Sequence, residues 1–212
     1  MTKDHGEPAE DAIYYLEQQE LTVDDFGAEG YVLDIGGGGE GIVGKLKGKQ
    51  VVAIDPNKRE LEEAASGPLK IIMDARDLQF PDRTFTVATS FFTLMYIKVP
   101  DHAEVFGEVL RVLRPGGRFL IWDVVLPQRL YQSKDFVAFP LLVKLPDEEV
   151  STGYGCPWPE KEQDLAYYAQ LAQDAGFEVV TESQENRVVF LELKAEEALE
   201  SGYQESHPRG LH

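Results

Sequence analysis

A run of four glycines directly after a short apolar segment is the feature that most constrains the fold of this chain. Residues 31–35 are apolar apart from Asp34, glycines 36–39 follow without a gap, and Gly41 comes two residues later. Glycines at the junction of a strand and a helix let the backbone approach a ligand that a Cβ atom would exclude. The pattern therefore predicts a nucleotide-type ligand at the carboxyl end of a β-strand.

The glycine spacing by itself fits two kinds of ligand. Gly36, Gly38 and Gly41 match the dinucleotide fingerprint, and Asp55 ends the next apolar run about 20 residues further on, as that fingerprint requires. Asp34, however, lies where it would repel a pyrophosphate and would attract a cationic amine. The charge at position 34 favours S-adenosylmethionine over NAD.

Short β-branched runs alternate with helical segments along the chain, a pattern typical of a parallel sheet covered by helices. The expected strands are residues 31–35, 50–54, 69–73, 85–90 and 118–125. The fold class predicted from this alternation is α/β, in one domain that spans residues 1–212.

Three helices have recognisable ends. Asn57 is expected to cap a helix over 57–66. Asp101 and Glu104 have the spacing of a capping box ahead of a helix whose apolar positions fall on one face. A later helix near 160–175 is expected to end at Gly176.

The remaining segments predict the periphery of the domain. Residues 126–159 are too long for an ordinary connection and rich in proline and aromatics, which indicates an inserted hairpin or lid after the fifth strand. Residues 177–183 and 187–193 are expected to form an antiparallel hairpin. We expect residues 9–21 to form a helix over the site and residues 200–212 to form a frayed tail.

Composition excludes several classes of partner and site. The chain has 38 acidic and 20 basic residues, a net charge of −18, so nucleic acid and anionic membranes would approach against a repulsive field. Cys156 is the only cysteine and the histidines are scattered, which argues against disulfides and against metal sites. Because the longest apolar runs are too short to span a bilayer and the first residues are polar and acidic, we expect a cytoplasmic protein.

Several motifs together resemble the class I S-adenosylmethionine-dependent methyltransferases, in particular the small-molecule type similar to the ubiquinone/menaquinone methyltransferases. The resemblance covers about residues 30–123 and rests on 32–38, Asp55, 74–80 and 110–117, the last ending in Arg-Pro-Gly-Gly. It implies a Rossmann-like sheet of seven strands with the last strand antiparallel, helices on both faces, and methyl transfer from the sulfonium of S-adenosylmethionine to give S-adenosylhomocysteine.

Two positions depart from the family pattern. The third glycine of the family aligns with Glu40, although Gly41 follows, and the acidic residue that usually opens the fourth strand is Thr86. Residues 90–93 also lack the Asn/Asp-Pro-Pro-aromatic signature of enzymes that methylate amines of nucleobases or glutamine. A small-molecule acceptor is therefore favoured.

The strand ends supply the residues that would hold the donor. Asp34 is expected at its cationic amine and Asp55 at the two ribose hydroxyls. Asp74 would accept a hydrogen bond from the adenine amine while the backbone N–H of Ala75 donates to a ring nitrogen. The full expected set is Asp34, Gly36, Gly38, Asp55, Asp74, Ala75 and Ser90.

Methyl transfer is an in-line displacement, so the protein mainly positions the acceptor and excludes water. A hydroxyl acceptor benefits from a general base, for which Asp123 and His102 are the candidates. An apolar acceptor pocket is expected from aromatic residues after the fourth strand and in the insertion: Phe91, Phe92, Tyr154 and Trp158.

Two alternatives stay open on the residues alone. An NAD-dependent oxidoreductase would predict a Tyr-x-x-x-Lys pair or an added catalytic domain, and no tyrosine here has a lysine four residues on. A non-catalytic partner subunit that binds S-adenosylmethionine is compatible with the sequence, because the chemistry demands no indispensable side chain.

Overall fold

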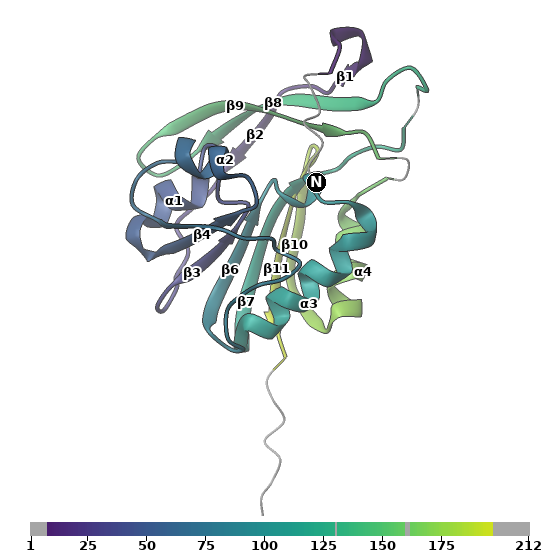
Figure 1. Ribbon diagram of the computed structural model, residues 1–212. Helices are drawn as coiled ribbons and strands as arrows, with labels where there is room; N and C mark the ends of the chain where they lie inside the picture. The colour runs from purple at the N-terminus through teal and green to yellow at the C-terminus, as the bar shows by residue number, and fades with distance from the viewer. Residues whose placement is uncertain (1–7, 130, 160–161, 197–212) are drawn as a thin grey trace, which may run out of the picture.

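The central element of the fold is a seven-stranded sheet. The computed structural model describes residues 8–129, 131–159 and 162–196, and within them the sheet has the strand order β10-β11-β7-β6-β3-β4-β5 (Figure 1). Strands β3 to β7 pair in parallel, and β11 runs antiparallel to β7 and β10. The strands are β3 (Val32–Ile35), β4 (Val51–Asp55), β5 (Leu69–Ile72), β6 (Phe85–Phe91), β7 (Leu113–Val124), β10 (Phe177–Glu185) and β11 (Val188–Ala195). The expected Rossmann-like sheet with an antiparallel last strand is confirmed.

The middle strands are buried on both faces. All of β3 is buried, as are residues 51–54 of β4. A parallel strand that is covered on both sides needs a continuous apolar run rather than an alternating one. This is why the first two apolar runs of the sequence predict strands.

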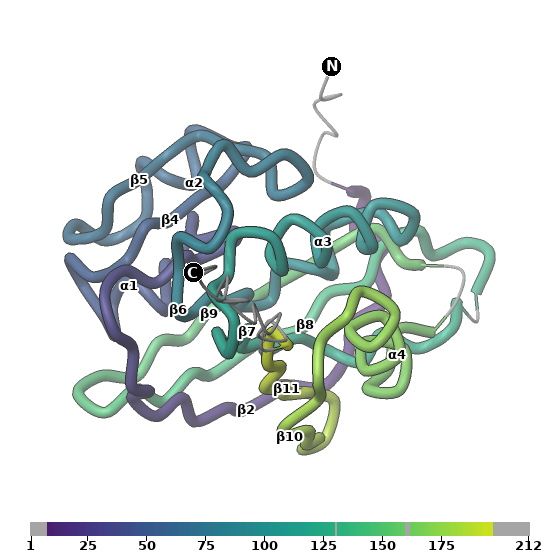
Figure 2. The backbone as a smooth tube through the Cα atoms, turned by 90° about the horizontal axis from the view of Figure 1, so that it is seen from below, coloured from purple at the N-terminus to yellow at the C-terminus, as the bar shows by residue number. Residues whose placement is uncertain are grey.

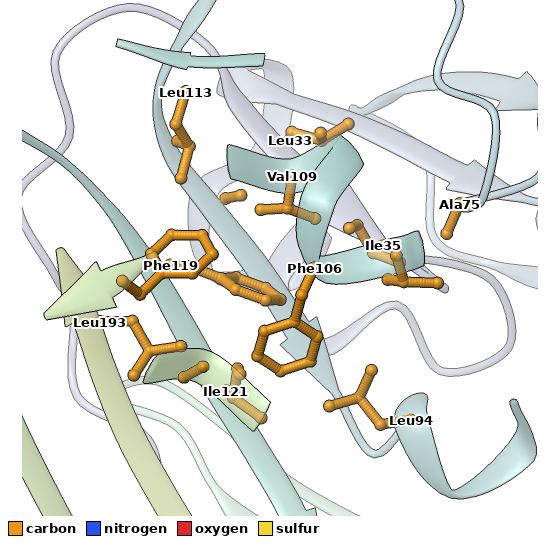
Figure 3. Packing of buried hydrophobic residues seen from close by; sticks show 14 of the residues in the cluster. Leu33, Ile35, Ala75, Leu94, Phe106, Val109, Leu113, Phe119, Ile121 and Leu193 are labelled. Carbon is orange, nitrogen blue, oxygen red and sulfur yellow. The ribbon is translucent and has the colours of Figure 1, made fainter. Parts of the chain in front are cut away.

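Two helices cover one face of this sheet. They are α3 (His102–Val112) and α4 (Leu165–Ala175), which lie side by side (Figure 2). Phe106 of α3 meets Phe119 of β7 edge to face, with ring centroids 5.5 Å apart, and Ile121 belongs to the same buried cluster (Figure 3). Helix-to-sheet packing of this kind forms the apolar core on that face.

The opposite face is covered by two short helices and a second sheet. The helices are α1 (Ile42–Lys47) and α2 (Lys58–Glu63). The second sheet contains β1 (Ile13–Tyr15), β2 (Gln19–Thr22), β8 (Phe136–Lys144) and β9 (Glu149–Pro157), and it crosses the carboxyl ends of the parallel strands, at the top of Figure 1. Its inward residues, such as Phe139, share a core with α1, α2 and the central sheet. The hairpin β8–β9 lies within the insertion 126–159, and its function as a lid stays a prediction.

The N-terminal segment corrects one expectation. Residues 9–21, expected as a helix, contain a 3-10 turn and the strands β1 and β2, which pair in parallel with β8. The exposed edge of β8 accepts these strands, and Leu16 between them is buried. The helix-forming residues 17–20 misled the prediction because the pairing partner lies more than a hundred residues away.

Helix ends follow the sequence signals in part. Asn57 caps α2 by accepting a hydrogen bond from the Arg59 N–H at 3.0 Å, but the helix ends at Glu63 because Ala64 becomes extended and buried. Gly176 ends α4 in the left-handed conformation, as expected. At α3 the predicted capping box is wrong.

Asp101 instead binds Arg76, which is 25 residues away in the sequence. Within the described residues its carboxylate accepts a hydrogen bond from Arg76 Nη1 at 2.9 Å, and the 3-10 turn Val99–Asp101 leads directly into α3. In the hydrogen bond to Arg76 both groups are charged, whereas in a hydrogen bond from a helix N–H only the carboxylate would be charged.

The expected tail, residues 200–212, lies outside the described residues. Among the helices that are described, none is long and apolar enough to cross a membrane.

We expect Phe106→Ala to lower the free energy of unfolding by about 3–5 kcal/mol, because it leaves a cavity where a fully buried ring met Phe119 and Phe177. Urea unfolding followed by circular dichroism measures this value. The half-exposed Val99→Ala serves as the control and should change it by less than about 0.5 kcal/mol. A loss below 1 kcal/mol at Phe106 would contradict the packing described here.

Candidate functional site

The candidate site lies at the carboxyl edge of the parallel strands, beneath the second sheet. Asp34 and Asp55 come from the ends of β3 and β4, Ser90 from β6, and Asp123 from β7. Parallel pairing brings the carboxyl ends of neighbouring strands to one edge, where ligands of open α/β sheets bind. The structure thus brings together residues that lie far apart in the sequence.

Asp34 is a buried carboxyl beside the glycine run. Only 2% of its surface is exposed, and its Oδ1 accepts a hydrogen bond from the Thr89 hydroxyl at 2.7 Å. Burial raises the pKa of Asp34 to about 7, the Thr89 hydroxyl opposes this rise, and the negative charge of Asp55 adds to it. The carboxyl therefore titrates near neutral pH and would be ionised fully by a nearby cation.

The glycines let the loop fit between side chains. A Cβ at Gly37 would come within 2.6 Å of Asp34 Oδ2, and one at Gly38 would come within 2.9 Å of Asp55 Oδ2. Gly36 has φ 70°, and a Cβ there would meet Thr93 Oγ1 at 2.2 Å. Gly37 and Gly38 are therefore required by the packing of the two carboxylates against the loop, and Gly36 is required by the Thr93 side chain.

Asp55 is held at the end of β4 by backbone donors. Its Oδ1 accepts a hydrogen bond from the Asn57 N–H at 2.7 Å. Burial raises the pKa of this carboxyl, while the N–H groups of Asn57 and Gly38 act in the opposite direction. The carboxylate is thus fixed beside the glycine loop with part of its surface open to a ligand.

Asp74 differs from the free acceptor that was expected at the adenine. Its Oδ2 lies 2.6 Å from Arg76 Nη2, and this ion pair lowers the pKa of the carboxyl. Arg76 also holds Asp101, so the loop after β5 is tied to the start of α3. Ala75 is buried next to this pair. The assignment of Asp74 and Ala75 to the adenine stays a prediction.

Glu40 is a site residue that the sequence did not single out. It stands at the end of the glycine run, and its carboxylate accepts hydrogen bonds from the Thr152 hydroxyl and, at 3.1 Å, from the Tyr154 hydroxyl. Both partners belong to β9, so Glu40 connects the loop to the second sheet. The only sequence signal was its presence where the related enzymes have a glycine.

The aromatic residues divide into two groups. The Phe92 ring stacks on Tyr154, with centroids 5.4 Å apart and planes at 11°, and lies 5.0 Å from Phe91. Trp158 instead stacks on Tyr14 at 4.6 Å, and its Nε1 donates a hydrogen bond to the Pro127 carbonyl at 2.8 Å. The expected substrate set is thus brought together at Phe91, Phe92 and Tyr154, whereas Trp158 packs with the N-terminal strand.

His102 is engaged on both ring nitrogens. The side chain is fully buried, Nε2 lies 3.0 Å from the carbonyl oxygens of Leu94 and Ile97, and Nδ1 lies 2.6 Å from the Tyr167 hydroxyl. Burial lowers the pKa of the imidazole, so the neutral ring donates from Nε2 and accepts at Nδ1. These contacts fix the 3-10 turn Leu94–Tyr96 against α4.

Asp123 is the second fully buried acid of the site. Its Oδ1 accepts a hydrogen bond from the Val124 N–H at 2.8 Å, and burial raises the pKa of the carboxyl to about 7. Among the residues described, Asp123 Oδ2 and Ser90 Oγ are the buried side-chain atoms without a hydrogen-bond partner.

The described part of the chain contains no cluster of three or more histidine, cysteine or acidic side chains that could hold a metal ion. Cys156 of β9 is buried, and burial raises the pKa of its thiol to about 12, so it is a neutral thiol at physiological pH.

Comparisons with known proteins identify the family. Residues 33–121 match the family described as methyltransferase domain. The ubiquinone/menaquinone biosynthesis C-methyltransferase UbiE of Pseudomonas putida (strain W619) is 32% identical over 170 residues, which cover 71% of this chain and 66% of that protein. The UbiE of Francisella philomiragia is 31% identical over 169 residues, with 70% of this chain and 67% of that protein covered.

A solved structure from Thermotoga maritima, described as a SAM-dependent methyltransferase and possible histamine N-methyltransferase, shares the fold. Its TM-score is 0.57 at 19% identity, with 79% of this chain and 83% of that chain covered. The chain belongs to the class I S-adenosylmethionine-dependent methyltransferases, a family whose methyl donor is S-adenosylmethionine. This membership favours neither the NAD-dependent oxidoreductase nor the non-catalytic partner subunit.

We expect Tyr154→Phe and Glu40→Gln each to destabilise the protein by about 1 kcal/mol, because each weakens a hydrogen bond to a charged group. In the double variant the loss should be smaller than the sum of the two by at least about 0.5 kcal/mol. Chemical denaturation of the four proteins measures the coupling. Tyr131→Phe, at an exposed tyrosine, is the control, and additive effects would contradict the contact between Glu40 and Tyr154.

Proposed function

We propose that this chain transfers a methyl group from S-adenosylmethionine to a small-molecule acceptor held between the carboxyl ends of the central strands and the second sheet. The observation that carries the proposal is the set of acidic groups around the glycine loop. The negative charge of Asp55 raises the pKa of both Asp34 and Glu60, which places these two acidic groups within electrostatic reach of Asp55. Such a site suits a donor that carries sulfonium and ammonium charges, and it would repel a pyrophosphate.

The residues present fit the donor. We assign Asp34 to its cationic amine, Asp55 to the ribose hydroxyls, and the backbone at Gly36 and Gly38 to close approach. Asp74 keeps free acceptor capacity beside Arg76, because a carboxylate offers about four lone-pair directions. The bound donor supplies a methyl group on a sulfonium, which is a good leaving group.

The acceptor is expected to be small and largely apolar. Phe91, Phe92 and Tyr154 supply aromatic surface where β6 ends beneath β9. The net charge of −18 disfavours a nucleic acid in this position. The protein's contribution is to align the acceptor with the methyl group and to exclude water.

We expect the affinity for S-adenosylmethionine to rise about 10-fold between pH 6 and pH 8, because donor binding requires the ionised form of Asp34, whose pKa is raised to about 7. Titration calorimetry in two buffers with different ionisation enthalpies should show proton release near pH 7, and Asp34→Asn should abolish it. Methylthioadenosine, which lacks both positive charges, should bind without proton release. If S-adenosylmethionine fails to bind while NADH binds, the proposed function is wrong.

We expect Asp55→Ala to weaken S-adenosylmethionine binding by about 1–3 kcal/mol, the loss typical of hydrogen bonds to a charged group. The same titration measures it. Asp147→Ala replaces an exposed aspartate in the turn between β8 and β9 and is the matched control. Unchanged affinity in Asp55→Ala would contradict the assignment of this carboxylate to the ribose.

A further inference from the structure

Within the residues described, two polar side chains at the ends of β6 and β7 each have one buried oxygen without a hydrogen-bond partner. Asp123 and Ser90 are both fully buried. Within the described ranges, neither Asp123 Oδ2 nor Ser90 Oγ has a hydrogen-bond partner. Because buried polar atoms in folded proteins are nearly always hydrogen-bonded, these two unpaired atoms indicate that a further group binds beside them.

The strand register places these two side chains on one face of the sheet. Ser90 pairs with Ile121 across the parallel strands β6 and β7, and Asp123 follows Ile121 by two residues. Residues two apart on a strand point to the same side, so Ser90 and Asp123 share the face covered by α3 and α4. Asp34 pairs with Thr89, and Thr89 pairs with Leu120, three residues before Asp123, so Asp34 lies on the opposite face and two strands away. At the usual strand spacing and rise the two Cα atoms are roughly 14 Å apart, a distance that a donor and a small acceptor can span around the carboxyl ends of the strands.

The surroundings of Asp123 contain no described cation. The titratable groups that face it are Tyr96 from the 3-10 turn Leu94–Tyr96, Cys156 from β9 and Tyr168 from α4. All three are neutral at physiological pH, because burial raises the pKa of each of them. Asp123 is therefore not one half of an ion pair in the part of the chain that is described.

The proton affinity of Asp123 suits proton transfer. Burial raises its pKa to about 7, and the N–H groups of Val124, Met95 and Leu94 offset only part of this effect. A general base works best when its pKa lies near the working pH.

We propose that Asp123 is the proton acceptor of the methyl transfer and that Ser90 positions the reacting group, a weakly acidic hydroxyl of the acceptor. This inference rests on the proposed function. The hydroxyl proton passes to the Asp123 carboxylate while the oxygen bonds to the methyl group. The carbon–sulfur bond breaks with its electron pair moving to sulfur, which becomes a neutral thioether. Asp123 then returns the proton to solvent after the products leave.

The test compares two acceptors of the same shape, 1-naphthol and 1-naphthalenethiol, with labelled S-adenosylmethionine at saturation. The thiol ionises near neutral pH without help, whereas the naphthol needs a base. Asp123→Asn should lower naphthol methylation by about 100-fold or more and thiol methylation by less than about 3-fold. Ser90→Ala should lower naphthol methylation by about 10-fold, the loss of one hydrogen bond. Asp174→Asn, at an exposed aspartate of α4, is the control and should leave both rates unchanged.

The pH profile gives a second reading that does not depend on the variant folding. In the unaltered protein the naphthol rate should rise with a midpoint near 7, as Asp123 loses its proton. Asp34 titrates in the same range, but a saturating donor keeps it ionised, and the thiol profile provides the reference. Equal losses for both acceptors in Asp123→Asn, or no transfer to naphthol by a protein that binds the donor, would overturn the assignment. Failure to bind the donor would instead overturn the proposed function.

Discussion

Parallel pairing of five strands is the constraint on which the rest of this structure depends, because it brings the carboxyl ends of these strands to one edge of the sheet. Asp34, Asp55, Ser90 and Asp123 are spread over some ninety residues of sequence, yet each follows an apolar strand and arrives at that edge. The second sheet then crosses the edge and removes water from it. Burial, rather than any local motif, is what gives the carboxyls of Asp34 and Asp123 their raised pKa.

Acidic groups buried in this way oppose folding. A carboxyl whose folded pKa lies above its unfolded value binds an extra proton in the native state, so its unfavourable contribution grows as the pH rises from about 4 to 7. The protein tolerates two such groups, and the pKa values of the nearby Asp55 and Glu60 are raised as well. An arrangement that reduces stability and complements a cation is typical of a binding site, where stability and function conflict.

Local signals in the sequence predicted the central sheet well. Continuous apolar runs gave β3 and β4, Asn57 marked the start of α2, and Gly176 marked the end of α4, because each of these features acts within a few residues. The errors arose where a distant partner decided the outcome. The Asp101 carboxylate, which was expected to cap α3, binds Arg76 instead. The N-terminal segment, which was expected as a helix, forms strands that pair with the edge of β8.

The candidate site follows the same division. The acids at the strand ends were found from their position after apolar runs, whereas the engagement of His102 with Tyr167 and two carbonyl groups depends on the packing of α3 against α4. The burial of His102 could not be predicted from the sequence either. The first turn of a helix is ordinarily exposed, but here the turn after β6 and the tyrosines of α4 contact this imidazole.

Glu40 shows how a departure from a family pattern gains a physical explanation from the structure. A glycine there would leave the Tyr154 and Thr152 hydroxyls without the carboxylate to which they now donate. Tyr154 also stacks on Phe92, next to the end of β6. One side chain of β9 therefore contacts both the loop assigned to the donor and the aromatic surface assigned to the acceptor. Since a displacement of β9 would break both contacts at once, the two halves of the site are mechanically linked through Tyr154.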